Sequence, residues 1–344
     1  MKKVIFVTGG SGFIGSTLIR FLLESENYLV VNIDKLTYAA KGNKLSSVEE
    51  DPNYFFEKCD ICNKNVVREL FNKYKPQLVF HLAAESHVDR SILTPSEFIK
   101  TNVLGTAVLL ECATEFYHTL PELAKKLWRF HHVSTDEVYG DLTPEEPAFT
   151  EQTAYAPSSP YSASKASSDH FVRAWNRTYG LPILITNCSN NYGPYQLPDK
   201  LIPLVISNAL QGHPIPLYGN GQQIRDWLYV EDHVRALYVV ACKGQTGETY
   251  NIGGESEMSN ISIVNQICEI LDNLKPINNG ELSSYKELIT FVKDRPGHDK
   301  RYAVDNGKLR RRLGWQAENT LDVGLEKTVD WYLKNLQWCE SVKT

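Results

Sequence analysis

The sequence has 344 residues, of which 42% are hydrophobic and 22% charged, and its formal net charge is −5. These values suit a folded protein with room for two lobes, and the negative charge argues against nucleic acid, which needs a basic face. Only a short apolar run follows Lys2 and Lys3, and no apolar stretch is long enough to span a bilayer. We therefore expect a cytoplasmic protein with no membrane partner.

Seven cysteines are scattered through the chain, an odd number that favours reduced thiols. Cys59 and Cys62 have the spacing of a redox motif, but no thioredoxin-like context surrounds them, and their role stays open. The cysteines and the nine histidines show no metal-ligand spacing, so we expect no metal. His131 and His132 lie in an apolar run and are expected in the core.

The first half of the chain alternates apolar runs with helical periodicity. The predicted strands are residues 4–8, 29–33, 54–57, 78–82 and 130–134, and the predicted helices are 13–23, 63–74 and 96–117. Continuous apolar strands alternating with helices predict an α/β fold, a Rossmann-like doubly wound parallel sheet covered on both faces.

After about Asn187 the predicted elements become short and mixed. Turn-rich stretches at 190–198 and 216–221 separate helical patterns at 202–210 and 261–271. We expect a smaller mixed α/β substrate lobe over the carboxyl ends of the strands, where open α/β sheets bind ligands.

A glycine-rich turn follows the first predicted strand. Gly9, Gly12 and Gly15 allow a tight turn and a close backbone approach to a pyrophosphate, at the positive end of the next helix. Asp34, at the end of the second strand, can accept hydrogen bonds from a ribose diol and would repel a 2′-phosphate. The pattern predicts NAD rather than NADP.

Tyr161 and Lys165 begin a predicted helix that runs to about residue 179. Their spacing places them on one helical face, where an ammonium beside a phenol favours the phenolate. We therefore expect Tyr161 to act as a base below its ordinary pKa near 10. Thr135, at a strand end, can hydrogen-bond the same reacting hydroxyl, so these residues predict a hydride-transfer site.

Asp136 and Glu137 follow Thr135, and a plain hydride-transfer site does not need them. Neighbouring acids push one pKa up and let acid and base roles be divided, which suggests removal of water. Successive strand residues face opposite sides, so both acids reach one substrate only if the strand has ended by Asp136. Gly140 favours such an end; two solvated acids are the alternative.

These motifs together resemble the extended short-chain dehydrogenase/reductases, and among them the nucleotide-sugar dehydratases. The resemblance runs over nearly the whole chain. It rests on Gly9-x-x-Gly12-x-x-Gly15, residues 82–89, 134–140 and 187–194, Tyr161-x-x-x-Lys165, Arg225-Asp226-Trp227 and residues 294–299. Related 4-epimerases usually carry small residues in place of Asp136-Glu137, and related decarboxylases a Ser-Glu, so the acid pair discriminates.

The resemblance implies 4,6-dehydration of dTDP-glucose on one tightly held NAD, within deoxysugar biosynthesis such as that of rhamnose. Tyr161 would take the proton of the 4-hydroxyl while hydride leaves C4, Thr135 would polarise the oxygen, and Lys165 would tune Tyr161 and hold the nicotinamide ribose. Glu137 would then remove the C5 proton and Asp136 would protonate the departing 6-hydroxyl. Hydride would return to C6 and C5 would be reprotonated, which gives a 4-keto-6-deoxy sugar nucleotide.

The implied ligand-binding residues form two sets. The cofactor set is Gly9, Gly12, Phe13, Ile14, Gly15, Asp34, Lys35, Leu36, Thr37, Asp60, Ile61, Leu82, Ala83, Ala84, Ser86, Thr101, Tyr161, Lys165 and Asn191. The substrate set is Ser86, His87, Thr135, Asn190, Lys200, Leu201, Arg225, Asn260, Arg295 and His298. Arg225 is the expected diphosphate partner because a guanidinium binds phosphate oxygens bidentately.

The resemblance also divides the chain and implies a dimer. Residues 1–187, with a return segment of about 226–253, form the expected NAD-binding domain, and about 188–225 and 254–344 the nucleotide-sugar-binding domain. A homodimer would form through a bundle of the helices near 96–117 and 161–179. The open alternatives are UDP-glucose as substrate, a nucleotide-sugar 4-epimerase and a non-catalytic NAD-sensing protein, which would tend to lose Tyr161 or Lys165.

Overall fold

Apolar runs form a seven-stranded sheet in the part of the chain that the computed structural model describes, residues 2–277 and 282–342. In spatial order its strands are β10 (Thr249–Ile252), β6 (Ile183–Cys188), β5 (Arg129–Thr135), β4 (Leu78–His81), β1 (Lys3–Thr8), β2 (Tyr28–Asp34) and β3 (Tyr54–Lys58). All neighbouring strands are parallel. The strand order reverses between β1 and β4, which opens a crevice at their carboxyl ends.

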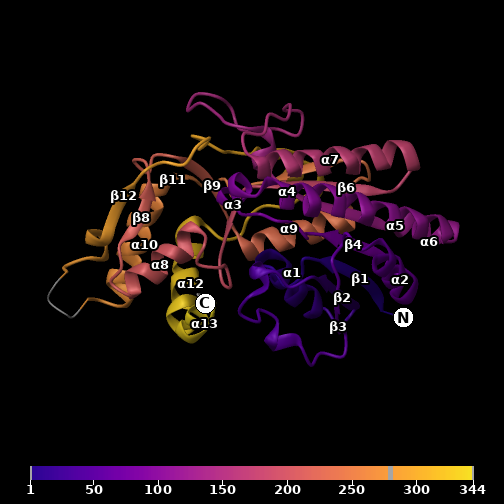
Figure 1. The fold of residues 1–344 in the computed structure, drawn as a ribbon, viewed down its shortest axis with the longest axis horizontal. Helices are drawn as coiled ribbons and strands as arrows, with labels where there is room; N and C mark the ends of the chain where they lie inside the picture. The colour runs from indigo at the N-terminus through magenta and orange to yellow at the C-terminus, as the bar shows by residue number, and fades with distance from the viewer. Residues whose placement is uncertain (1, 278–281, 343–344) are drawn as a thin grey trace.

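Helices cover both faces of this sheet (Figure 1). On one face lie α1 (Phe13–Leu23), α9 (Val230–Lys243) and α11 (Gly307–Leu313), which bury Leu18, Val234 and Leu309 against it. On the other lie α2 (Lys64–Tyr74), α5 (Gly105–Thr119) and α7 (Pro160–Tyr179), which bury Leu70, Leu110 and Val172. The predicted Rossmann-like doubly wound fold is confirmed.

The helical pattern at 96–117 is several elements rather than one. Short helices α3 (Val88–Leu93) and α4 (Pro95–Phe98) precede a π-helical segment, Ile99–Leu104, which continues into α5, and α6 (Glu122–Leu127) follows. A π-helical turn is wider than an α-helical one and often occurs at functional sites. Here it carries the buried Thr101 and Asn102 towards the carboxyl end of β4.

The predicted smaller mixed lobe is present and lies at the left of Figure 1. Its sheets are β11 (Glu257–Ser259), β9 (Ile224–Tyr229) and β7 (Asn190–Tyr192), and β12 (Ile289–Val292) with β8 (Ile215–Tyr218). Its helices are α8 (Leu201–Leu210), α10 (Asn260–Leu274), α12 (Leu321–Lys334) and α13 (Leu336–Ser341). Val205, Ile263 and Leu325 are fully buried in its core.

Two details concern the predicted boundaries of this lobe. Residues 216–221 do not form only a turn, because Pro216 lies in β8 opposite Thr290 of β12, and the turn begins at Gly219 (φ +59°). A two-stranded sheet tolerates proline because its strands are edges. β10 joins the large sheet and β9 the small one, although β10 and most of β9 fall within the predicted return segment. The exact domain division stays a prediction. Within the described residues no helix combines the length and apolar character needed to cross a membrane.

Candidate active site

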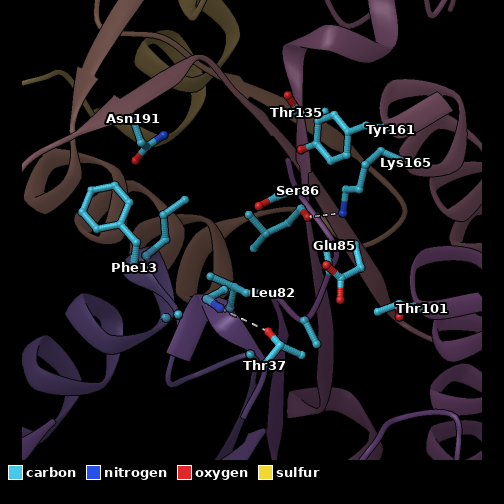
Figure 2. Close-up of a pocket in the computed structure, with 18 of the residues that line it drawn as sticks. Phe13, Thr37, Leu82, Glu85, Ser86, Thr101, Thr135, Tyr161, Lys165 and Asn191 are labelled. Carbon is cyan, nitrogen blue, oxygen red and sulfur yellow. Dashed lines mark hydrogen bonds between the residues drawn. The ribbon is translucent and has the colours of Figure 1, made fainter. Parts of the chain in front are cut away.

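A cavity of about 310 Å³ lies at the carboxyl ends of the central strands. Figure 2 shows Phe13 on one side of it and Thr135, Tyr161 and Lys165 on another. Most of the predicted cofactor residues line it, namely Gly9, Gly12, Phe13, Ile14, Gly15, Asp34, Lys35, Thr37, Ile61, Leu82, Ala83, Ala84, Ser86, Thr101, Tyr161, Lys165 and Asn191. The structure therefore brings the glycine turn and the Tyr-Lys pair into one site.

The glycine turn packs its backbone too closely for side chains. A Cβ on Gly9, whose φ is +71°, would lie 2.7 Å from Cα of Ala83, and one on Gly15 would lie 2.3 Å from the carbonyl oxygen of Gly9. Gly12 is the N-cap of α1, and among the described residues no side chain caps this helix. An uncapped helix N-terminus at a cavity wall is suited to a phosphate group.

Asp34 is held at the end of β2 by two backbone amides. Ser11 N donates to its Oδ2 at 3.0 Å and Leu36 N to its Oδ1 at 2.8 Å. Burial raises the pKa of Asp34, and these two hydrogen bonds oppose the rise. Its oxygens keep lone pairs for a ribose diol, so the carboxylate and the glycine turn together fit a dinucleotide without a 2′-phosphate.

The strand that leads to the acid pair ends before Asp136. β5 stops at Thr135, and Asp136–Tyr139 form a 3-10 turn that frees the two acids from strand alternation. Thr135, Asp136 and Glu137 all line the cavity. Ser159 caps α7 with a capping box, and Pro160 is the first helical residue, so Tyr161 enters the cavity from the first turn.

The two acids occupy different electrostatic surroundings. Burial raises the pKa of Asp136 well above its usual range, and the charges of Glu137 and Asp226 add to the rise. Burial also raises the pKa of Glu137, but Arg295 and Arg225 lower it. Asp136 therefore favours the protonated acid, while Glu137 keeps more carboxylate character.

The expectation that the pKa of Tyr161 lies below its ordinary value near 10 is wrong for this arrangement. The Lys165 ammonium donates to the carbonyl of Val133 at 2.9 Å, a bond visible in Figure 2. Burial raises the pKa of Tyr161 well above 10, with a further contribution from Glu137, while a hydrogen bond with Thr135 opposes the rise. Desolvation of the buried phenolate outweighs its stabilisation by nearby groups.

The predicted substrate residues divide into two groups. Ser86, Thr135, Asn190 and Lys200 line the cavity, and Lys200 Nζ donates to the carbonyl of Ser86 at 3.3 Å. The other six, His87, Leu201, Arg225, Asn260, Arg295 and His298, lie outside the lining residues.

Arg225 is turned inward rather than into the cavity. Its side chain is buried, one guanidinium nitrogen donates to the carbonyl of Asp299 at 2.9 Å, and the group stacks 4.3 Å from the ring centre of Tyr302. Arg295 Nη1 lies 3.5 Å from Asp89 Oδ1. Both cations still act on the pKa of Glu137, so the acid end of the cavity borders a basic region.

The remaining differences concern the cavity edge. Two predicted cofactor residues lie outside the lining: Leu36, which is 46% exposed, and Asp60, whose Oδ2 is 4.0 Å from Lys35 Nζ. Lining residues that the sequence reasoning missed include Tyr38, Ala39, Ala40, Glu85, Cys188, Gln196, Leu197 and Asp199. Those at 38–40 directly follow the predicted Thr37, whereas those at 196–199 come from the second lobe and carry no local signal.

Cys59 and Cys62 are free thiols. Burial raises the pKa of each to about 11, which disfavours the reactive thiolate.

The comparisons with known proteins all identify nucleotide-sugar 4,6-dehydratases as similar to this chain. The GDP-mannose 4,6 dehydratase family model matches residues 6–328. The chain is 59% identical to dTDP-glucose 4,6-dehydratase from Haemophilus influenzae, with 96% of this chain and 98% of the relative covered. It is similar to the crystal structure of dTDP-glucose 4,6-dehydratase from Bacillus anthracis in complex with NAD, at a TM-score of 0.87, 41% identity and 99% coverage of both chains. It is also similar to the Streptomyces venezuelae dTDP-glucose 4,6-dehydratase with NAD and dTDP bound, at a TM-score of 0.88, 41% identity and coverage of 98% and 99%.

Proposed function

The chain belongs to the family of the dTDP-glucose 4,6-dehydratases, and from this premise we propose that it converts dTDP-glucose to dTDP-4-keto-6-deoxyglucose and water. The observation that carries the proposal is the Asp136-Glu137 pair, which lines the same cavity as Tyr161 and Lys165. Oxidation alone needs one base, whereas elimination of water across C5 and C6 also needs a base for C5 and an acid for the leaving hydroxyl. The protein is thus a hydro-lyase that uses NAD without net redox change.

The glycine turn, the uncapped N-terminus of α1 and Asp34 would hold the pyrophosphate and adenosine ribose of NAD. Lys165 and Tyr161 would contact its nicotinamide half. When bound, NAD supplies the hydride acceptor for C4, positive charge beside Tyr161 and the hydride that returns to C6.

Tyr161 accepts the proton of the sugar's 4-hydroxyl. Thr135 hydrogen-bonds the oxygen at C4 and helps to polarise it. Because burial raises the pKa of Tyr161, this step depends on positive charge that favours the phenolate. The Lys165 ammonium, fixed by the carbonyl of Val133, contributes such charge.

In the elimination, Glu137 acts as the base and Asp136 as the acid. Glu137 removes the proton at C5, since Arg225 and Arg295 favour its carboxylate form. Asp136 protonates the departing 6-hydroxyl, since burial raises its pKa and favours the acid form. This division matches the general rule that acid and base roles follow from environments that move two pKa values apart.

The diphosphate of the substrate is assigned to the basic region of Lys200, Arg225 and Arg295. Lys200 is in the cavity wall, and the two arginines lie near the acid pair. The preference for dTDP is supported by the high identity to dTDP-glucose 4,6-dehydratases and by the dTDP-bound neighbour. Arg225 must turn away from Asp299 to pair with phosphate oxygens directly; otherwise it acts through its charge.

A homodimer is proposed through α7 and the segment from α3 to α5. Leu93, Ile99, Leu104 and Phe171 expose 80%, 59%, 52% and 39% of their surface along these elements. Exposed apolar side chains on neighbouring helices favour association. Light scattering with Leu104→Glu as the interface variant tests this proposal; a wild-type monomer would contradict it. We also propose a cytoplasmic location, which suits a chain with an odd number of scattered cysteines.

Incubation with dTDP-glucose in deuterated water tests the activity. We expect a 6-deoxy-4-ketone that carries solvent deuterium at C5, because the elimination removes the C5 proton and C5 is later reprotonated with a proton exchanged with solvent. Formation of dTDP-galactose alone would instead support the epimerase alternative. A parallel reaction with UDP-glucose measures base preference through kcat/KM, and we expect the dTDP sugar to be favoured.

A further inference from the structure

Asp169 is a buried carboxylate that the proposed reaction does not use. It lies on α7 one helical turn after Lys165 and two turns after Tyr161, and it is 0% exposed. It is outside the residues that line the cavity. Burial of an ionised carboxylate is costly unless hydrogen bonds and opposite charges compensate, so its contacts deserve a specific explanation.

The contacts of Asp169 tie α7 to the catalytic end of β5. Ser134 Oγ donates to its Oδ2 at 2.9 Å, and the hydroxyl of Tyr155 donates to the same oxygen at 2.8 Å. Asn187 Nδ2 lies 3.4 Å from Oδ2 and donates to the carbonyl of Thr135 at 3.0 Å. The Asp169 carboxylate therefore holds Ser134 directly, and it holds Thr135 through Asn187.

The groups around Asp169 also favour its negatively charged form. Burial by itself would raise its pKa, but His132, whose Nε2 lies 3.1 Å from Oδ1, together with Lys165 and Arg173 holds the pKa below its ordinary value. Burial lowers the pKa of His132 to about 4, so this imidazole is neutral at pH 7. Asp169 is thus a fixed negative charge beneath the active site.

Lys165 lies one helical turn before this charge on the same helix. Burial lowers the pKa of its ammonium, and the negative charge of Asp169 opposes that effect. The titratable groups around the pair include His81 on β4, His132 on β5, Cys188 on β6, Arg173 on α7, Tyr139 and Tyr155. Burial lowers the pKa of His81 and raises that of Cys188 to about 12, so both are neutral. Asp169 is the anion that acts on Lys165.

We propose that Asp169 is a positioning residue that keeps Lys165 protonated and fixes the Ser134-Thr135 end of β5 against α7. The inference rests on the proposed function, because it deepens the account of how Tyr161 and Lys165 work. It assigns to Asp169 no contact with substrate or cofactor. It affects catalysis indirectly, because it stabilises the positive charge of Lys165 and fixes the position of Thr135.

The test uses Asp169→Asn, which keeps the shape of the side chain and removes the charge. The ζ-nitrogen of Lys165 is titrated by NMR in protein labelled with ¹⁵N-lysine, and its signal is assigned by its loss in Lys165→Arg. We expect the titration midpoint to fall by about one pH unit or more in Asp169→Asn. We also expect kcat with dTDP-glucose to fall about tenfold or more with little change in KM, and its alkaline limb to move to lower pH.

Asp232→Asn is the matched control. Asp232 is another fully buried carboxylate, but it lies on α9 and accepts from the backbone amides of Glu318 and Asn319. Its substitution should lower thermal stability without moving the Lys165 titration. An unchanged Lys165 titration in folded Asp169→Asn would overturn the charge part of the proposal.

Ser134→Ala removes the hydrogen bond from Ser134 to Asp169 but keeps the charge of Asp169. It also tests the proposal if Asp169→Asn does not fold. We expect a lower kcat, an unchanged KM and an unchanged Lys165 titration, because the Asp169 carboxylate remains. Wild-type kcat in Ser134→Ala would overturn the positioning part. If the wild type does not turn over dTDP-glucose, the proposed function fails, while the NMR titration still decides the role of Asp169.

Discussion

Asp136 and Glu137 are adjacent in the chain, yet their carboxyl groups face different charges. Asp136 is 1% exposed and is near the acids Glu137 and Asp226, so burial and repulsion both raise its pKa. Glu137 is near Arg295 and Arg225, which lower its pKa against the effect of burial. Both acids reach one cavity because β5 ends at Thr135 and the next residues form a 3-10 turn.

Glu137→Gln should block the removal of the C5 proton. The amide cannot act as a base, and a general base typically contributes about 10²–10⁴-fold to rate. We expect deuterium incorporation at C5 to fall by roughly that factor, while some reduction of bound NAD⁺ is still seen by absorbance at the first turnover. Glu326→Gln, an exposed glutamate on α12, is the control. Unchanged exchange in Glu137→Gln would refute its role as the base.

Asp136→Asn should slow the elimination of water, and it should make the fold more stable than wild type at high pH. The folded-state pKa of Asp136 lies well above the unfolded value near 3.9, so its neutral form stabilises the fold at low pH. That stability is lost as pH rises through the folded pKa, whereas asparagine cannot ionise.

Thermal unfolding at pH 5, 7 and 9 measures this effect. We expect the variant to gain stability relative to wild type as pH rises, by about 1 kcal/mol or more at pH 9. Loss of water from C6 should slow by about 10²-fold at neutral pH because the proton donor is gone. A stability difference that does not change with pH would show that Asp136 titrates normally.

Tyr161→Phe should abolish the first oxidation, because phenylalanine cannot take the proton of the 4-hydroxyl. We expect formation of NADH on mixing with dTDP-glucose to slow by about 10²-fold or more. Tyr179→Phe removes a hydroxyl from the exposed end of the same helix and should react as wild type does. Substantial NADH formation by Tyr161→Phe would count against Tyr161 as the base.

The parts of the site that are local in sequence were predictable. Gly9, Gly12 and Gly15 between a strand and a helix, and Asp34 at the next strand end, define a cofactor site through spacing alone. The end of β5 was also predictable, since Gly140 adopts a φ of +96° just after the acid pair. Such features need only short-range geometry, which residue type and periodicity record.

The parts that depend on packing between distant segments were not predictable. Arg225 donates to the carbonyl of Asp299, 74 positions away, so sequence could not show that it turns from the cavity. The pKa of Tyr161 was expected to be lowered, because the spacing to Lys165 is visible while the burial that raises it is not. Gln196 and Asp199 enter the cavity from the second lobe, whose position is set by tertiary packing.

Gly9→Ala tests whether the glycine turn is required for its closeness to the next strand or only for its conformation. Gly9 and Gly180 have nearly equal φ angles of +71° and +69°, so alanine meets similar backbone strain at both, about 1 kcal/mol. A Cβ at Gly180 would meet no atom within 4 Å, whereas one at Gly9 would lie 2.7 Å from the backbone of Ala83.

Only Gly9→Ala must therefore push the turn away from the strand end at Ala83, and with it the wall of the cofactor cavity. We expect calorimetric NAD affinity to fall tenfold or more in Gly9→Ala and to stay at the wild-type value in Gly180→Ala. Both variants should lose thermal stability, with the larger loss at Gly9. Equal NAD affinities in the two variants would mean that the close approach of Gly9 to Ala83 does not shape the cofactor site.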